Sequence, residues 1–159
     1  FKVADSQVAS RWGNILEFRG FDLITPNERE ARFALGDQDL IVRPLGLELY
    51  RQAACKTLIL KLGERGLLAF QSVPRNTEDV RAFFALDSFA ERIIDAVGSG
   101  DALLAYAALA LYSSGKPVVA SVLGSLAAAV ECEHEGNVPV SPKNVVDKLE
   151  RFERLANFR

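Results

Sequence analysis

Short apolar runs that end in a polar residue alternate along this chain with longer segments of helical periodicity. Runs of this kind predict strands, because β-branched and aromatic residues suit a pleated, half-buried surface. The turn sequence GERG lies between two of the runs and predicts either a hairpin or a tight crossover, and the polar segment 72–80 is typical of a turn-rich loop. We expect strands at residues 1–5, 21–25, 57–61, 67–71 and 82–86.

The predicted helices begin at recognisable sequence signals. Thr25 precedes Pro26 and lies three residues before Glu28, a combination of N-cap, first-turn proline and capping-box acid that starts a helix. Ser141 and Pro142 start the last helix in a similar way. Its apolar residues recur at the spacing of a surface helix that buries one stripe: Val145, Val146, Leu149, Phe152 and Leu155. Further helices are expected at residues 44–54, 99–113 and 117–131.

Strands that alternate with helices favour an α/β fold, in which helices lie on the faces of a mostly parallel sheet. The chain has 159 residues, of which 49% are hydrophobic and 25% are charged. A chain of this size suits one domain, which buries roughly 70% of the surface that its unfolded form exposes. We therefore predict a single α/β domain over residues 1–159.

Charge and cysteine content narrow the class of partner. The net charge of −2 and the scattered Lys and Arg residues argue against nucleic acid or an anionic membrane, and favour a small molecule. Two Cys, no CxxC pair and one His argue against a disulfide framework or a zinc site and favour the reducing cytosol, with Cys55 and Cys132 buried. The longest apolar run, residues 102–112, is too short to span a membrane, and no secretory signal is expected.

The segment DAVGSGDALLAYAALAL, residues 95–111, is the strongest candidate for chemistry. Its helix has almost no polar face, which predicts burial, yet carboxylates and small residues stand at its start. Backbone N–H groups at a helix start lack intrahelical acceptors, and together with the helix dipole they attract anions. Gly98, Ser99 and Gly100 would let a phosphate group approach this backbone closely.

Asp101, in the first turn, can act as a general base that removes a proton from a hydroxyl group attacking a phosphoryl group at the helix start. The alternative is structural, because Asp, Gly and Ser are ordinary helix-start and turn residues, and the string alone favours that interpretation. Other phosphate motifs do not match: the sequence has no GxxxxGK[ST], and GSGDAL lacks the third Gly of the dinucleotide fingerprint.

Three segments, in order, resemble one family. DAVGSGDALLAYAALAL is similar to the C-terminal signature of the PfkB or ribokinase-like carbohydrate kinases, DTxGAGD followed by a helix of small residues. LITPNEREA resembles their strand and N-x-x-E segment, and LILKLGERGLLAF resembles their T-L-G-x-x-G hairpin. VADSQ and GSLAAAVECEHEGNVPVS add a similarity to heptose 7-phosphate kinases, the kinase part of ADP-heptose synthase.

The resemblance implies a ribokinase-like three-layer sandwich with a mostly parallel sheet, present here as its C-terminal portion. It also implies ATP-dependent phosphoryl transfer to a hydroxyl group of a sugar or sugar phosphate in the cytoplasm. Asp101 would be the general base in this reaction. The anion hole for the transferred phosphoryl group would be formed by Gly98, Ser99 and Gly100.

The family implies further binding residues. Mg²⁺ and its water shell would be held near the phosphates by Asn27 and Glu30, and Asp95 matches an acid linked to a monovalent cation, whose use stays open. Two residues depart from the family pattern: Lys61 replaces a Thr, so an ammonium group would take the place of a hydroxyl group, and Ala96 replaces the Thr beside Asp95. The nucleotide would be bordered by Lys61, Gly63, Gly66, Ser125 and Asn137.

Several of these residues have a structural alternative. Asn27 and Glu30 could equally be an exposed pair in the first turn of a capped helix. Ser125 could equally be an ordinary serine of a core helix. His134 lies in the polar segment ECEHEGN, and we expect it to be solvated and not catalytic.

The start of the chain bears on the activity. The sequence begins in a predicted strand and contains no Met, which suggests a fragment or a processed chain. The family carries its sugar-binding segments in its first half, so we expect this chain alone to lack the acceptor half and to be poorly active. Two other functions stay open: an ATP- or ADP-dependent dehydratase of the same fold, and a nucleotide-binding module without catalysis. A homodimer also stays open, because a truncated sheet would expose an edge.

Overall fold

The structure is a computed structural model, and it describes residues 1–5, 14–71 and 83–157. The chain forms two compact units, Phe1–Asp87 and Ser88–Arg159. The prediction of a single domain stays a prediction, because compactness alone does not show whether either unit folds independently. The predicted loop at residues 72–80 lies outside the described residues.

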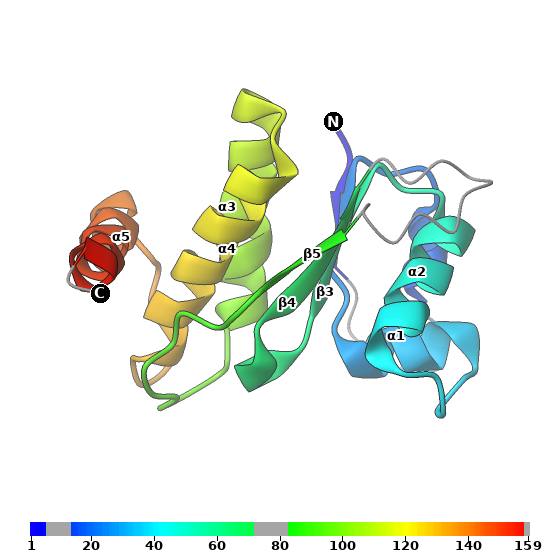
Figure 1. Cartoon of the computed structure of the whole chain (residues 1–159), viewed down its shortest axis with the longest axis horizontal. Helices are drawn as coiled ribbons and strands as arrows, with labels where there is room; N and C mark the ends of the chain where they lie inside the picture. The colour runs from blue at the N-terminus through cyan, green and yellow to red at the C-terminus, as the bar shows by residue number, and fades with distance from the viewer. Residues whose placement is uncertain (6–13, 72–82, 158–159) are drawn as a thin grey trace. The chain divides into compact units, whose positions relative to one another are not determined.

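The first unit is built on a five-stranded sheet whose strands lie in chain order (Figure 1). β1, β2 and β3 are parallel, whereas β4 is antiparallel to both β3 and β5. Four of the five strands therefore run in the same direction, which confirms the α/β class and the mostly parallel sheet. The strands are β1 (Val3–Ala4), β2 (Leu23–Ile24), β3 (Thr57–Lys61), β4 (Leu67–Gln71) and β5 (Phe83–Leu86), each within a predicted range.

β3 and β4 form a hairpin, which decides between the two alternatives for the GERG turn. The antiparallel register pairs Thr57 with Gln71 and Lys61 with Leu67. A short 3-10 helix, η2 (Gly63–Arg65), makes the turn between the two strands. The hairpin brings β4 back beside β3 without a crossover. Because β1, β2 and β3 are parallel, their carboxyl ends lie at the same edge of the sheet.

The first helix, α1 (Glu28–Leu35), begins later than predicted, and Thr25 is not its N-cap. The backbone N–H of Thr25 donates to the carbonyl oxygen of Ala4 (3.1 Å), so this residue still belongs to the pairing of β1 with β2. Its buried side-chain oxygen has no hydrogen-bond partner among the described residues. Asn27 caps the helix instead, because the chain first leaves the sheet there.

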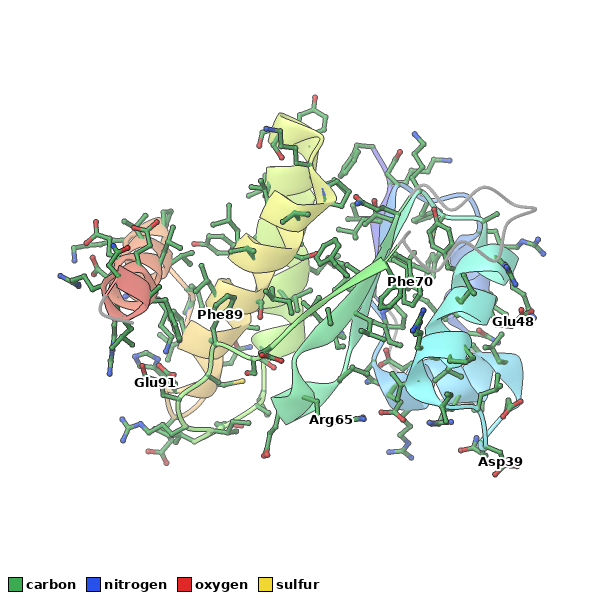
Figure 2. The ribbon with its side chains drawn as sticks, in the orientation of Figure 1. Asp39, Glu48, Arg65, Phe70, Phe89 and Glu91 are labelled. Atoms are coloured by element: carbon green, nitrogen blue, oxygen red, sulfur yellow. The ribbon has the colours of Figure 1, made fainter. Side chains whose placement is uncertain are left out.

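α2 (Val42–Ala53) packs on the sheet with α1 and closes the core of the first unit. It begins two residues before the predicted range, and Pro44 falls in its first turn, where a missing N–H costs nothing. Phe70 points from β4 toward α2 (Figure 2), and a Cβ on Gly46 would lie 2.5 Å from its ring. The unpredicted 3-10 helix η1 (Ile15–Phe18) joins this core. The buried residues of the core are Ala4, Ile15, Ile24, Ala31, Leu45, Leu49, Tyr50, Ala53, Cys55, Leu58, Leu60, Leu68 and Phe70.

In the described residues of the second unit, three helices confirm the predicted ones: α3 (Ser99–Ser114), α4 (Pro117–Cys132) and α5 (Pro142–Asn157). α3 packs closely on α4 at Gly124, where a Cβ would lie 2.9 Å from the carbonyl oxygen of Leu103. The predicted burial of α3 is wrong in part, since Leu109 and Tyr112 are exposed. Ala107 and Ala110 are buried and are small enough to allow close packing on one face of this helix. Among the described residues, no helix has both the length and the apolar character to cross a membrane.

The last helix is capped as predicted, but its buried stripe differs. The backbone N–H of Asn144 donates to the Oγ of Ser141 (3.2 Å). Val146 and Leu155 are 50% and 55% exposed, which corrects the predicted stripe. Lys148 lies in the stripe instead, because its ammonium group pairs with Glu133 (2.5 Å) and can be buried. The residues facing the unit are therefore Val145, Lys148, Leu149 and Phe152, at helical spacing.

The two cysteines differ in burial. Cys55 lies in the core of the first unit, and burial raises the pKa of its thiol to about 12. Cys132, at the end of α4, is only partly buried. The predicted burial is therefore confirmed for Cys55 alone, and both cysteines are free thiols.

Candidate active site

The carboxyl ends of the three parallel strands bring candidate residues together in the first unit. Asp5 follows β1, Asn27 follows β2, and Lys61 is the last residue of β3. A parallel bridge between Asn27 and Lys61 continues the pairing of β2 with β3 to this edge. Ligands of α/β sheets bind at this edge, because the loops that follow parallel strands converge there.

Asn27 and Glu30 are joined by a reciprocal capping box at the start of α1. The Oδ1 of Asn27 accepts from the backbone N–H of Glu30 (2.8 Å), and the backbone N–H of Asn27 donates to the Oε2 of Glu30 (2.7 Å). Glu30 is 6% exposed, so the alternative of an exposed first-turn pair is wrong for this residue. The N-x-x-E spacing is also the spacing of a capping box, and the same two side chains can serve both purposes.

Three ionisable side chains cluster at this edge. The Nζ of Lys61 pairs with the Oδ2 of Asp5 (2.6 Å), and each of the two side chains is 18% exposed. Burial raises the pKa of Glu30 above its usual range, and the negative charge of Asp5 adds to that effect. The backbone N–H of Asn27 and the positive charge of Lys61 act in the opposite direction, and burial outweighs them.

Glu30→Gln is expected to stabilise the fold increasingly as the pH rises. Because the folded-state pKa of Glu30 lies above its ordinary value of 4.5, its contribution to stability is full below that value and is lost as the pH rises through the folded pKa. Glutamine resembles the protonated form and keeps an oxygen for the Asn27 N–H. Urea unfolding of both proteins at about pH 4.5 and about pH 7.5 measures the difference. A pH-independent difference, equal to that of the exposed control Glu64→Gln, would contradict this expectation.

Asn27 and Glu30 fit a hydrated magnesium ion better than a directly bound one. Within the described residues, no group of three or more His, Cys, Asp and Glu is placed to hold a metal ion. Each of the two side chains already gives one oxygen to the capping box, and a carboxylate or amide oxygen can accept more than one bond. Mg²⁺ keeps several of its waters in most sites, so these oxygens can bind it through water.

The two glycines of the hairpin have different surroundings. Gly63 is exposed, and a Cβ there would meet nothing within 4 Å. A Cβ on Gly66 would lie 2.0 Å from the carbonyl oxygen of Leu86, and Gly66 has a φ of +82°. Arg65 of the turn pairs with Glu28 in the first turn of α1, which ties the hairpin to the capped helix. The close approach of the neighbouring strand therefore requires glycine at position 66, independently of any contact with a nucleotide.

In the second unit, α3 begins at the segment Gly98–Gly100. Gly98 is the N-cap, with a φ of +84°, and a Cβ there would lie 2.7 Å from the Oδ1 of Asn137 and 2.8 Å from the Oε1 of Glu131. The Oγ of Ser99 donates to the carbonyl oxygen of Ala96 (2.7 Å), which closes the turn before the helix. Asp101 is exposed in the first turn. Protein side chains occupy the space on the side of Gly98 where a Cβ would lie. A phosphate group would therefore have to approach Gly98 from another side.

Asp95 joins the two loops beside this helix start. Its Oδ1 accepts from the backbone N–H of Val97 (3.0 Å), and its Oδ2 accepts from that of Gly136 (3.3 Å). The backbone N–H of Asp95 donates to the carbonyl oxygen of Cys132 (3.2 Å). These bonds hold the turn before α3 against the end of α4.

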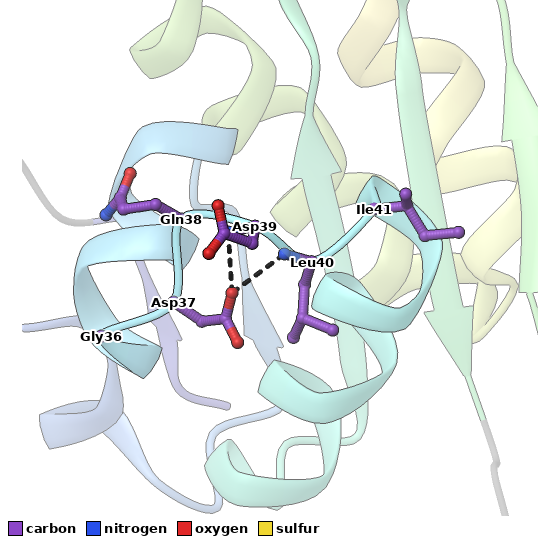
Figure 3. A pocket seen from close by; sticks show the side chains of 6 residues that line it. All are labelled: Gly36, Asp37, Gln38, Asp39, Leu40 and Ile41. Carbon is purple, nitrogen blue, oxygen red and sulfur yellow. Dashed lines mark hydrogen bonds between the residues drawn. The ribbon is translucent and has the colours of Figure 1, made fainter.

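A separate hollow lies between α1 and α2 (Figure 3). Residues 36–41 line it, and the Oδ1 of Asp37 accepts from the backbone N–H groups of Asp39 and Leu40, both at 2.9 Å. These two bonds shape the loop that connects the helices. None of the candidate residues lies in this hollow.

Comparison with known proteins identifies the family. The model of the pfkB family carbohydrate kinases matches residues 3–144. The chain belongs to the PfkB carbohydrate kinase family. It is 31% identical over 130 residues to the bifunctional protein HldE of Proteus mirabilis, covering 79% of this chain and 25% of that protein. With the HldE of Geobacter metallireducens it shares 30% identity over 137 residues, covering 84% of this chain and 26% of that protein. The chain thus spans about a quarter of the length of these curated relatives.

Solved structures confirm the ribokinase-like fold of this PfkB-family chain. Ribokinase from Thermotoga maritima superposes with a TM-score of 0.73 at 24% identity, covering 93% of this chain and 48% of that chain. Phosphofructokinase-2 from Escherichia coli, in a complex with potassium, gives a TM-score of 0.73 at 17% identity, covering 87% of this chain and 43% of that chain. At such identities the likeness shows the fold.

The structure gathers the predicted site residues of this PfkB-family chain into two groups, one in each unit. Ser125 stands apart, buried within α4, as the structural alternative for this residue predicts. His134 is exposed, as predicted, and its Nδ1 lies 2.7 Å from the carbonyl oxygen of Val130. The first group comprises Asn27, Glu30, Lys61, Gly63 and Gly66, and the second comprises Asp95, Gly98, Ser99, Gly100, Asp101 and Asn137.

Two residues beside these groups were given no role by the sequence analysis. Asp5 pairs with Lys61, and its signal is the position directly after a parallel strand. Glu131 is 2% exposed, lies over Gly98, and accepts from the backbone N–H of Val138 (3.0 Å). Its signal is weaker: position 131 continues the buried stripe of α4 that contains Gly124 and Ala127. The surrounding acidic segment hides that periodicity.

Proposed function

We propose that this chain is the nucleotide side of an ATP-dependent kinase that phosphorylates a hydroxyl group of a sugar or sugar phosphate. One observation supports the proposal above the others. In a member of the PfkB carbohydrate kinase family, an exposed carboxylate, Asp101, stands in the first turn of a helix that opens with Gly98, Ser99 and Gly100. A base and an anion-attracting helix start are thus adjacent in the chain.

In the proposed reaction, Asp101 accepts the proton of the acceptor hydroxyl group on a carboxylate oxygen. The hydroxyl oxygen forms a bond to the γ-phosphorus of ATP, and the bond from that phosphorus to the β,γ-bridging oxygen breaks, which releases ADP. Negative charge on the transferred group is stabilised by the backbone N–H groups and the dipole at the start of α3. Asp95 supports this helix start by holding the turn before it.

The first unit supplies the proposed contacts to the nucleotide phosphates. The oxygens of Asn27 and Glu30 would hold the water shell of Mg²⁺, which would neutralise phosphate charge when bound. The ammonium group of Lys61, at the end of β3, would interact with a phosphate where the family has a hydroxyl group. We also propose Asp95 for a monovalent cation, a role that its two N–H contacts leave room for, because each carboxylate oxygen has a second lone pair.

We propose a sugar phosphate of the heptose 7-phosphate type as the acceptor. The similarity to bifunctional HldE proteins supports this choice, together with the sequence resemblance to heptose 7-phosphate kinases. Product analysis tests the choice directly: a bisphosphorylated heptose and ADP are expected in equal amounts. A dehydrated product, or turnover of unphosphorylated sugars alone, would contradict it.

Binding of Mg-ATP to this chain tests the nucleotide role. Gly100→Val is expected to raise the Kd, measured by isothermal titration calorimetry, at least about tenfold, because its side chain would stand where the phosphate approaches. Asp101→Asn is expected to leave the Kd within about twofold, since a base acts on the acceptor and not on ATP.

Ala105→Val is the matched control, because residue 105 is exposed on the same helix, away from its start. Its Kd should equal that of the parent chain. Equal binding by Gly100→Val and Ala105→Val would contradict phosphate binding at this helix start. No binding by a folded parent chain would contradict the nucleotide role as a whole.

A further inference from the structure

We infer that Asp5 is a positioning residue, which holds the ammonium group of Lys61 as a fixed cation for the nucleotide phosphates. The inference rests on the proposed function and adds to it a role for Asp5, a residue of the VADSQ segment to which the sequence assigned no role. It also explains how a lysine can occupy a position where the family has a short hydroxyl side chain.

The backbone of Lys61 is fixed by the sheet. Its N–H donates to the carbonyl oxygen of Pro26 (2.8 Å), and it forms a parallel bridge with Asn27. A lysine side chain in such a place still has four rotatable bonds, and immobilising it on a ligand costs rotamer entropy. An anchor that immobilises the side chain before the ligand arrives removes much of this cost.

Asp5 is that anchor. β1 and β3 are not neighbours, because β2 lies between them, so Lys61 reaches across the end of β2 to meet Asp5. The Nζ and Oδ2 atoms are 2.6 Å apart, and each side chain is 18% exposed. An ammonium group has three donors, and the Asp5 oxygen takes one of them. The remaining donors stay at the edge where the loops after the parallel strands converge.

The charges around Lys61 shape what it can bind. Asp5 and Glu30 both act on the same ammonium group, and with both ionised the three side chains carry a net charge of −1. Simple electrostatics therefore predicts that the loss of the Asp5 charge would strengthen the binding of an anion. Positioning predicts the opposite, because the ammonium group would lose its orientation. The sign of the effect distinguishes the two explanations.

The experiment measures the Kd of Mg-ATP for the parent chain, Asp5→Asn, Lys61→Met and the double variant by isothermal titration calorimetry. We expect Lys61→Met to raise the Kd about tenfold and Asp5→Asn to raise it about threefold to fivefold, although a negative charge is lost. The double variant should bind no more weakly than Lys61→Met alone, since Asp5 acts through Lys61.

Asp22→Asn is the matched control. Asp22 and Lys56 form an ion pair of the same length, 2.6 Å, before β2 and β3, at the opposite end of the same strands. Removing it changes the charge of the sheet equally, and the Kd should stay within about twofold of the parent value. Circular dichroism and thermal unfolding show that each variant is folded at the temperature of the titration.

Two results would overturn the inference. In the first, Asp5→Asn binds Mg-ATP as well as the parent or more tightly, while Lys61→Met binds it weakly. This result would show that Asp5 does not position the ammonium group. Unchanged binding by Lys61→Met would remove Lys61 itself from the site. In both cases the proposed function stands as long as Gly100→Val weakens binding. A folded parent chain without affinity for Mg-ATP would overturn the proposed function, and this inference with it.

Discussion

Asp101→Asn is expected to lower the kcat of phosphoryl transfer by about 10²–10⁴-fold in the active protein, with little change in the Kd of Mg-ATP. The amide has nearly the shape of the carboxylate but cannot accept the proton of the acceptor hydroxyl group. Asp101 is exposed, so the loss of its charge removes only the favourable interaction with the helix dipole, about 0.3–1 kcal/mol. Fold stability should therefore change far less than kcat.

Steady-state kinetics at saturating acceptor, with the Kd of Mg-ATP measured separately, distinguishes a base from a binding residue. Asp147→Asn is the control, because Asp147 is exposed on α5 and pairs only with Lys143 in the contacts described. Its kcat should equal that of the parent protein. Near-parent turnover of Asp101→Asn would refute the assignment of the general base. A large rise in Kd with unchanged kcat would instead place Asp101 in nucleotide binding.

Gly66→Ala is expected to be the most destabilising of the substitutions considered, by about 3–5 kcal/mol. The new Cβ would lie 2.0 Å from the carbonyl oxygen of Leu86 and 2.7 Å from the carbonyl carbon of Asp87. These are backbone atoms at the end of β5, which cannot rotate away as a side chain can. Gly66 also has φ +82° and ψ −128°, a conformation that only glycine adopts readily. A loss of this size is a large part of the stability of an ordinary domain.

Gly63→Ala tests the cause in the same turn. Gly63 also has a positive φ, +63°, but a Cβ there would meet nothing within 4 Å. The backbone conformation alone should cost about 1–2 kcal/mol. Urea unfolding at equilibrium, with the slope checked for each variant, measures both free energies. Equal losses for the two substitutions would show that the approach of β5 to the hairpin is not what requires glycine at position 66.

Local patterns account for most of the secondary structure and for the start of α3. Apolar runs such as TLILK and LLAFQ have the length and composition of strands, and their boundaries agree with the structure. The Gly-Ser-Gly-Asp string placed the start of α3 correctly, because glycine and a first-turn acid are local signals of a helix start. The sequence predicts a capping box from Thr25 to Glu28, and the structure forms it from Asn27 to Glu30 instead.

Interactions between distant residues required the tertiary structure. Thr25 has the composition of an N-cap, but its N–H bonds to Ala4 of a neighbouring strand, and no local signal reports that bond. Lys148 does not belong to the apolar stripe predicted for the last helix, yet its pairing with Glu133 allows it to be buried. In both cases a partner far along the chain changes the free energy of placing a polar group.

The sequence by itself determined the α/β class, the order of strands and helices, and the family, since these follow from periodicity and from contiguous motifs. Only the tertiary structure decided that Lys61 is held by Asp5 and that Gly98 lies beneath Glu131. The physical reason is that an ion pair, or the close approach that a glycine allows, depends on which atoms lie within a few ångströms in space. Residues 56 positions apart in the chain become neighbours only when parallel strands align their ends.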